Sequence, residues 1–160
     1  MPRSDRPSAT TLPAPPPVDI AQYAGTWYEQ GSVKQSPSVV LVNIRAVYTP
    51  QSDGTITVEN SGNTGGPNGP AWSTTGSAIP VNAFNTRFNV TYSGVPSTDE
   101  PGNYWILDYA PDYSWAIVSD PDGTSGFILT RDQIIPAAEY DGLVARAYRL
   151  GVRGTITPTP

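Results

Sequence analysis

The sequence of 160 residues predicts an all-β protein, an eight-stranded antiparallel up-and-down barrel with one C-terminal α-helix packed outside. Eight short runs of alternating apolar and polar residues, separated by turn residues, predict the strands. Most connections are short, so successive strands are expected to pair as antiparallel neighbours. A sandwich would hold the same strands, but simple hairpin order favours the barrel because a barrel leaves no exposed edge.

Composition excludes several kinds of site. The chain contains no Cys and no His, which excludes disulfides, thiolate nucleophiles, zinc sites that need Cys and the Ser-His-Asp arrangement. No metal and no cofactor are therefore expected. The formal net charge is −5, and an acidic surface does not attract the phosphate backbone of a nucleic acid. No apolar run reaches the roughly 20 residues that a membrane-spanning helix needs.

The N-terminal segment differs from the rest of the chain. Residues 1–17 contain six prolines and show no hydrophobic periodicity, which predicts a disordered, proline-rich leader. The segment also lacks the apolar stretch of a secretory signal. The folded domain is expected to span residues 18–157, with residues 158–160 as a tail.

The strand predictions follow the chain in order. A short helical turn is expected within residues 18–24, and the strands follow at residues 27–33, 39–48, 55–58, 72–79, 86–92, 104–109, 113–119 and 126–130. The sequence Ser52-Asp53-Gly54 is a strong hairpin signal between the second and third strands. Residues 61–70 (SGNTGGPNGP) predict an irregular loop, and residues 154–157 could add a last short strand.

Residues 136–150 change from a period of two to a period near 3.6, which predicts the helix. Its apolar stripe, which includes Leu143 and Ala147, must lie on an apolar surface. The seventh predicted strand offers such a surface, because its outward row is expected to hold Tyr113, Trp115 and Ile117.

Alternation along each strand predicts which residues face the interior. In the second strand, Asn43 and Arg45 share one face, and burying both without partners would cost several kcal/mol. The other face should therefore point inward. The same argument, applied strand by strand, predicts these ligand-binding residues: Ile44, Ala46, Tyr48, Ile56, Val58, Trp72, Thr74, Phe88, Val90, Tyr92, Tyr104, Ile106, Ala116 and Phe127.

The predicted inner face mixes very large side chains with very small ones, and its tyrosines bring hydroxyl groups to the surface. An apolar cavity with a few polar groups is what a small-molecule site needs. Side chains can also fill an eight-stranded barrel completely. Spacing alone favours neither a hollow nor a solid barrel.

Three segments together resemble the lipocalin family. Residues 25–29 (GTWYE), preceded by 18–23 (VDIAQY), are similar to the first signature of the family. Within the family, this segment most resembles bacterial lipocalins and apolipoprotein D. Residues 104–116 are similar to its second region, and Leu129-Thr130-Arg131 before the helix to its third. The three occur in the expected order, and the resemblance covers about residues 18–157.

The resemblance implies a calyx that Trp27 closes at one end, with Arg131 crossing the indole, so both residues are interpreted as structural rather than catalytic. The open end would be rimmed by loops at residues 35–38, 62–70 and 95–102. By family resemblance only, the protein is expected to be secreted or in the cell envelope.

Three functions follow from these expectations. The first is storage or transport of a small hydrophobic ligand, lipid or fatty-acid-like, with no catalytic residues. The second is an isomerase or cyclase on the same scaffold, in which Glu29, Asp108 or a tyrosine acts as acid or base. The third is haem binding through a tyrosine, because no His is present.

Overall fold

The computed structural model describes residue 12, residues 14–33 and residues 41–159. A short helix, α1 (Ile20–Tyr23), precedes the strands β1 (Gly25–Val33), β2 (Leu41–Pro50), β3 (Ile56–Thr64), β4 (Ala71–Pro80), β5 (Arg87–Thr91), β6 (Tyr104–Tyr109), β7 (Trp115–Ser119) and β8 (Gly126–Thr130). The helix α2 (Ala137–Leu150) and the short strand β9 (Ile156–Pro158) complete the chain. The expected rim loop at residues 35–38 lies outside the described residues.

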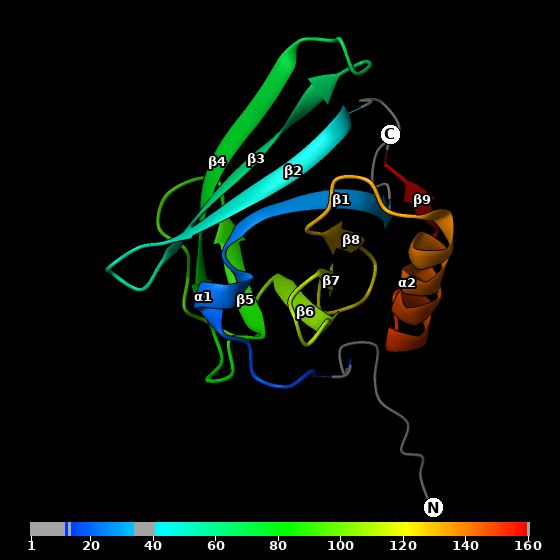
Figure 1. Cartoon of the computed structure of the whole chain (residues 1–160). Helices are drawn as coiled ribbons and strands as arrows, with labels where there is room; N and C mark the ends of the chain where they lie inside the picture. The colour runs from blue at the N-terminus through cyan, green and yellow to red at the C-terminus, as the bar shows by residue number, and fades with distance from the viewer. Residues whose placement is uncertain (1–11, 13, 34–40, 160) are drawn as a thin grey trace, which may run out of the picture.

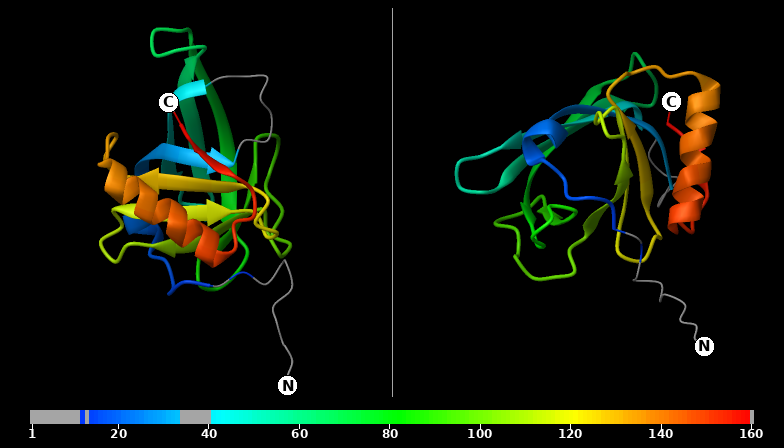
Figure 2. Two further views of the ribbon diagram at one scale, coloured as in Figure 1. Left: turned by 90° about the vertical axis from the view of Figure 1, so that its right-hand side faces the viewer. Right: turned by 60° about the horizontal axis from the view of Figure 1, so that its bottom comes forward.

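Eight strands close into one antiparallel barrel, which confirms the predicted fold class and excludes the sandwich (Figures 1 and 2). The sheet runs from β2 through β8 in chain order and then to β1. β1 closes the ring because it pairs with β8 on one edge and with β2 on the other, where Trp27 lies opposite Ala46. β9 is an additional strand that pairs with the last residues of β1.

Two apolar clusters lie on the two sides of the barrel wall. The inner core fills the closed end of the barrel and contains Trp27, Ile106 and Ala116 among others. The outer core lies between β6, β7, β8 and α2, where Ile117 and Leu143 are buried. The helix therefore covers the outward face of the seventh strand, as predicted (Figure 2).

Tyr113 differs from its prediction. It precedes β7, has a positive φ of 60° and belongs to the inner core rather than to the outward row. Trp115 packs against the outer core and Ile117 lies within it, as expected. The difference arises because the tight turn before β7 breaks the alternation that places Trp115 and Ile117 outside.

The prediction of an irregular loop over residues 61–70 was partly wrong. β3 continues to Thr64, where it pairs with Leu41 of β2, and Asn63 pairs with Ala71 of β4. Only residues 65–70 connect the two strands. Polar segments that contain glycine have a low intrinsic tendency to form strands. Here the end of β3 stays in the sheet because its backbone pairs with β2 on one edge and with β4 on the other.

A bulge in β6 reverses the orientation predicted for Asp108. The pairing with β7 shifts between Ile106 and Asp108, so that Asp108 lies opposite Ile117 of the outer core. The Asp108 carboxylate binds Arg146 of α2 outside the barrel, at 3.0 Å between Oδ2 and Nη1. An extra residue in one strand turns the residues after it to the other face, and Asp108 is therefore not an inward acid or base.

Both chain ends have contacts that the sequence did not predict. Within the leader, Leu12 packs against the outer core, and the Tyr109 hydroxyl donates to the carbonyls of Pro16 and Pro17 at 3.1 and 2.7 Å. In the expected tail, Pro158 ends β9 and the Thr159 hydroxyl donates to Glu29 at 2.6 Å. The expectation for residues 1–11 and 13 lies outside the described residues.

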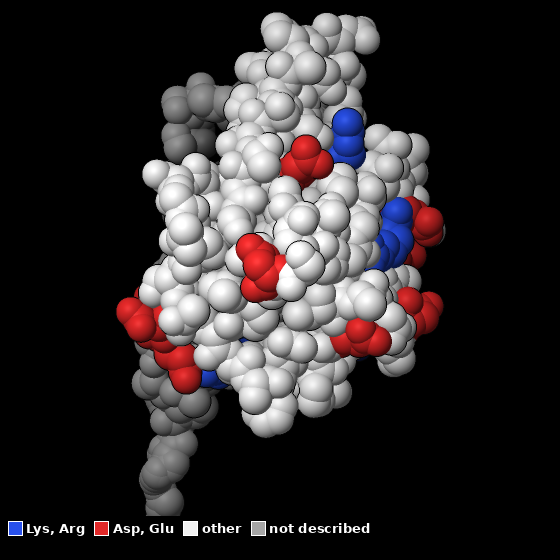
Figure 3. All heavy atoms as spheres, turned by 90° about the vertical axis from the view of Figure 1, so that its left-hand side faces the viewer, with Lys and Arg blue, Asp and Glu red and all other residues white. Residues whose placement is uncertain are grey.

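Charged side chains are sparse and separated on the face of the molecule that Figure 3 shows. Acidic groups are scattered over this face, and the few basic groups form no patch on it.

Within the part of the chain that the structure describes, neither helix has the length and apolar character that crossing a bilayer requires.

Candidate ligand-binding cavity

The barrel is hollow between its mouth and Trp27, which itself lines the bottom of the hollow. A cavity of about 370 Å³, called the barrel cavity below, is lined by residues from all eight strands of the barrel, β1 to β8, and reaches residues near the mouth such as Trp72 and Phe127. A cavity of this size lies within the range of small-molecule sites. The solid barrel that the sequence left open is therefore excluded for this half of the molecule.

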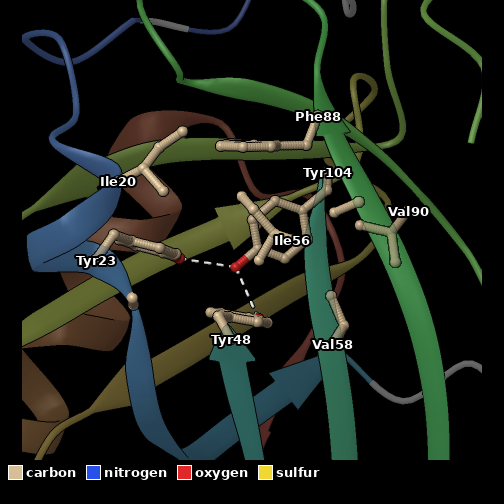
Figure 4. A pocket seen from close by; sticks show the side chains of 10 residues that line it. Ile20, Tyr23, Tyr48, Ile56, Val58, Phe88, Val90 and Tyr104 are labelled. Carbon is tan, nitrogen blue, oxygen red and sulfur yellow. Dashed lines mark hydrogen bonds between the residues drawn. The ribbon is translucent and has the colours of Figure 1, made fainter. Parts of the chain in front are cut away.

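A smaller recess lies beneath α1, on the far side of the barrel from the mouth. It has a volume of about 20 Å³, little more than one water molecule needs. Ile20, Tyr23 and Phe88 line it, as Figure 4 shows. Tyr48 and Tyr104 line both the recess and the barrel cavity, so the two hollows meet at these tyrosines.

Most of the predicted ligand-binding residues line one or both hollows. The barrel cavity and the recess together are lined by Ile44, Ala46, Tyr48, Ile56, Val58, Trp72, Phe88, Val90, Tyr92, Tyr104 and Phe127. At the mouth, Phe127 and Tyr92 keep 36% and 52% of their surface exposed, so an incoming ligand can reach them. Their role in binding stays a prediction.

Three predicted residues line neither hollow. Ile106 and Ala116 are 1% and 0% exposed and pack within the inner core, where neighbouring side chains leave no space beside them. Thr74 shares a face of β4 with Trp72 but also lies outside both linings.

Several lining residues were missed by the sequence analysis. Asn60 continues the inward alternation of Ile56 and Val58 by one step, a signal that was lost because the third strand was predicted to end at residue 58. Ser32 lines the cavity because β1 has a bulge between Glu29 and Gly31. Arg45, predicted to point outward, remains exposed but contributes to the lining beside a bulge in β2.

Tyr92 lies across β4 at a position that only glycine allows. A Cβ atom on Gly76 would come within 2.6 Å of the Tyr92 ring and of the Thr91 carbonyl oxygen. The Tyr92 hydroxyl accepts a hydrogen bond from the Asn60 amide at 2.5 Å. The missing side chain of Gly76 therefore makes room for the Tyr92 ring in the barrel wall.

Three tyrosine hydroxyls form a chain where the two hollows meet. The Tyr104 oxygen lies 2.7 Å from that of Tyr23 and 2.9 Å from that of Tyr48. Figure 4 marks these two hydrogen bonds with dashed lines. Burial is the main cause that raises the pKa of each of these tyrosines above its ordinary value. The three phenols therefore stay protonated and neutral at physiological pH.

Trp27 closes the floor of the barrel. It is 0% exposed, and its indole Nε1 donates to the Tyr23 carbonyl at 2.8 Å. The Arg131 guanidinium lies 3.8 Å from the centre of the indole ring and donates to the carbonyls of Thr26, Gln22 and Tyr113. This is the geometry that the resemblance implies, with a cation over an aromatic face and its hydrogens bound to backbone oxygens.

The barrel wall opens beside β1. Among the described residues, the pairing of β1 with β2 ends at Tyr28 and Arg45, and the following part of β1 pairs with β9 instead. Glu29 and Ile44 line the barrel cavity on one side and an outer groove of about 300 Å³ on the other. The Glu29 carboxylate accepts a hydrogen bond from Thr159 and so links the wall of the cavity to the end of the chain.

Comparison with known proteins supports the family resemblance. The family described as "Lipocalin-like domain" matches residues 18–155. Temperature-induced lipocalin-1 of Arabidopsis thaliana is 30% identical over 141 residues, which cover 84% of this chain and 74% of the relative. A putative lipocalin of Acanthamoeba polyphaga mimivirus is 33% identical over 139 residues, which cover 84% of this chain and 79% of that protein.

Solved structures show the same fold at lower identity. A lobster apocrustacyanin aligns with a TM-score of 0.62 at 16% identity, over 92% of this chain and 89% of its own. The cockroach allergen Per a 4 aligns with a TM-score of 0.64 at 18% identity, over 93% of this chain and 92% of its own. At these identities the likeness concerns the fold, because one fold can carry many functions.

Proposed function

The chain belongs to the lipocalin family, and from that premise we propose that it binds a small hydrophobic molecule in the barrel cavity, for storage or transport and without chemical change. The observation that carries the proposal is the cavity of about 370 Å³. Aromatic and aliphatic side chains, among them Trp72, Val90 and Phe127, make up much of its lining. Burial of apolar ligand surface against them is worth about 25 cal/mol per Å².

The positions of the two candidate carboxylates favour binding over catalysis. Asp108 lies outside the barrel, in an ion pair with Arg146. Glu29 lines the barrel cavity but holds the Thr159 hydroxyl at 2.6 Å, a structural link to the C-terminal segment. Secretion or a location in the cell envelope is part of the proposal and rests on the family resemblance alone.

A neutral fluorescent probe, N-phenyl-naphthylamine, tests the proposal. We expect wild-type protein to bind it, and Phe127→Ala or Trp72→Ala to weaken binding by about five- to tenfold, since each substitution removes part of an aromatic contact worth about 1 kcal/mol or more. Phe84→Ala is the matched control, because Phe84 is 58% exposed and lines neither hollow. Absence of binding by the wild type, or equal losses in all three variants, would contradict the proposal.

A further inference from the structure

The hydroxyl chain of Tyr23, Tyr104 and Tyr48 carries one more hydrogen than its two hydrogen bonds use. Three hydroxyl groups carry three hydrogens, and the two bonds between them use two. Whichever way the two bonds point, one hydrogen has no acceptor among the described residues. A buried donor of this kind gains from an acceptor, because an unsatisfied one costs about 1–3 kcal/mol.

The unused hydrogen can be directed into the barrel cavity. Tyr48 and Tyr104 line that cavity, whereas Tyr23 lines only the recess beneath α1. If Tyr23 donates to Tyr104, the free hydrogen belongs to Tyr104 or Tyr48. The apolar side chains of Val58 and Val90 flank both hollows at this point, and in such surroundings a hydrogen bond is electrostatically stronger than in water.

Glu29 favours an uncharged acceptor in the barrel cavity, whereas the cationic Arg131 acts on Tyr23, which lines only the recess. Glu29 lines the same cavity, and its negative charge adds to burial in raising the pKa of Tyr48. An anionic head group beside Tyr48 would meet the same unfavourable field and would lose its hydration. The cationic Arg45 also lines the cavity but is exposed to solvent, so it screens this field less than a buried cation would.

From this geometry we infer that the protein selects an amphiphile whose buried end carries a neutral hydrogen-bond acceptor, the carbonyl oxygen of a ketone or ester, bound by Tyr48 or Tyr104. The inference rests on the function proposed above and names its ligand class. The apolar part of the ligand extends from the tyrosines toward Trp72 and Phe127 at the mouth.

Three probes of equal chain length separate the two proposals. Octane tests the apolar cavity, methyl hexyl ketone adds a neutral acceptor, and octanoate adds a charged one. We expect wild-type protein to bind octane and the ketone, and octanoate more weakly than the ketone. If the wild type binds none of them, the proposed function fails; if it binds octane but prefers octanoate to the ketone, only this inference fails.

Variants identify the donor. The double substitution Tyr48→Phe with Tyr104→Phe removes both hydroxyls that line the cavity, and should weaken ketone binding about two- to tenfold while octane binding is retained. Tyr23→Phe should keep the ketone affinity, because Tyr48 and Tyr104 still share one bond and one free hydrogen. Tyr140→Phe is the matched control, since Tyr140 lies on α2 and lines neither hollow. Unchanged ketone affinity in the double variant, or an equal loss in Tyr140→Phe, would overturn the inference.

A spectroscopic measurement on wild-type protein keeps the inference testable even if the double variant fails to fold. The infrared carbonyl stretch of bound methyl hexyl ketone should lie at lower frequency than that of the ketone in an alkane solvent, because a hydrogen bond weakens the C=O bond. A stretch at the alkane-solvent frequency would overturn the inference, since the carbonyl would then have no donor.

Discussion

The two ends of the barrel use aromatic side chains in opposite ways. At the floor, Trp27 is 0% exposed, and an arginine covers its ring and binds three backbone carbonyls. At the mouth, Trp72, Tyr92 and Phe127 line a hollow and keep part of their surface accessible. The comparison predicts that stability depends mainly on the floor and the proposed ligand binding mainly on the mouth, so single substitutions should separate them.

The largest effect is expected at the floor. Trp27→Ala should lower the free energy of unfolding by about 3–5 kcal/mol, as truncations of buried aromatics do. Denaturant titration measures the loss. Trp72→Ala serves as its counterpart at the mouth and should change stability by about 1 kcal/mol or less, since Trp72 is only half-buried. Equal losses in the two variants would remove the distinction between the ends.

Arg131→Met should cause the next largest decrease in the free energy of unfolding. The substitution keeps much of the apolar stem but removes the charge over Trp27 and all three hydrogen bonds to backbone carbonyls. We expect a loss of about 1.5–3 kcal/mol, which is typical of hydrogen bonds to charged groups. Arg131→Lys should recover only part of it, because an ammonium group cannot reach all three carbonyls. Full recovery in the lysine variant would mean that charge alone matters.

The tyrosine chain between floor and mouth should make stability sensitive to alkaline pH. Burial raises the pKa of Tyr23, Tyr48 and Tyr104 above the ordinary value of 10.0. Above pH 10 the folded state keeps phenol protons that the unfolded chain releases. The free energy of unfolding is therefore unaffected by these tyrosines below pH 10 and falls as the pH rises above 10. At pH 11 the three tyrosines together should lower the free energy of unfolding by on the order of a few kcal/mol, as measured by denaturant titration.

Tyr48→Phe provides the comparison for the pH series. The difference in unfolding free energy between wild type and variant, measured by denaturant titration, should be constant up to pH 10. Above that pH it should shift in favour of the variant. A constant difference up to pH 11 would show that Tyr48 ionises in the folded protein as readily as in the unfolded chain.

The smallest effect is expected on the outer wall. Asp108→Asn breaks the ion pair with Arg146, whose side chains are 24% and 43% exposed, respectively. A partly exposed pair is screened by solvent, and its loss should cost about 1 kcal/mol or less and decrease further at high salt. Ligand binding should be unchanged, because Asp108 lies outside the barrel. A loss of ligand affinity in this variant would mean that Asp108 contributes to the barrel cavity after all.

Strands that pair without interruption could be predicted from alternation. Ile56 and Val58 of β3 and Phe88 of β5 lie in the inner core, on the face that the sequence indicated. The helix and its contact with β7 were also predictable, because both depend on periodic apolar stripes.

Where a strand has a bulge, alternation predicted the wrong face. Asp108 shares its predicted face with Tyr104 and Ile106, yet one extra residue in β6 turns it toward α2. The bulge in β1 likewise places Ser32 in the cavity. A bulge is defined by how two strands pair, and no local pattern in one strand reveals where its partner will slip.

The sequence by itself determined the strand order, the helix that covers one side of the barrel and most of the inward face, because these depend on residues near one another in the chain. Only the tertiary structure decided that the barrel is hollow near its mouth and that Tyr23, Tyr48 and Tyr104 meet. A cavity is the volume left after side chains from many distant strands have packed, and a hydroxyl chain depends on distances that the closure of the barrel sets.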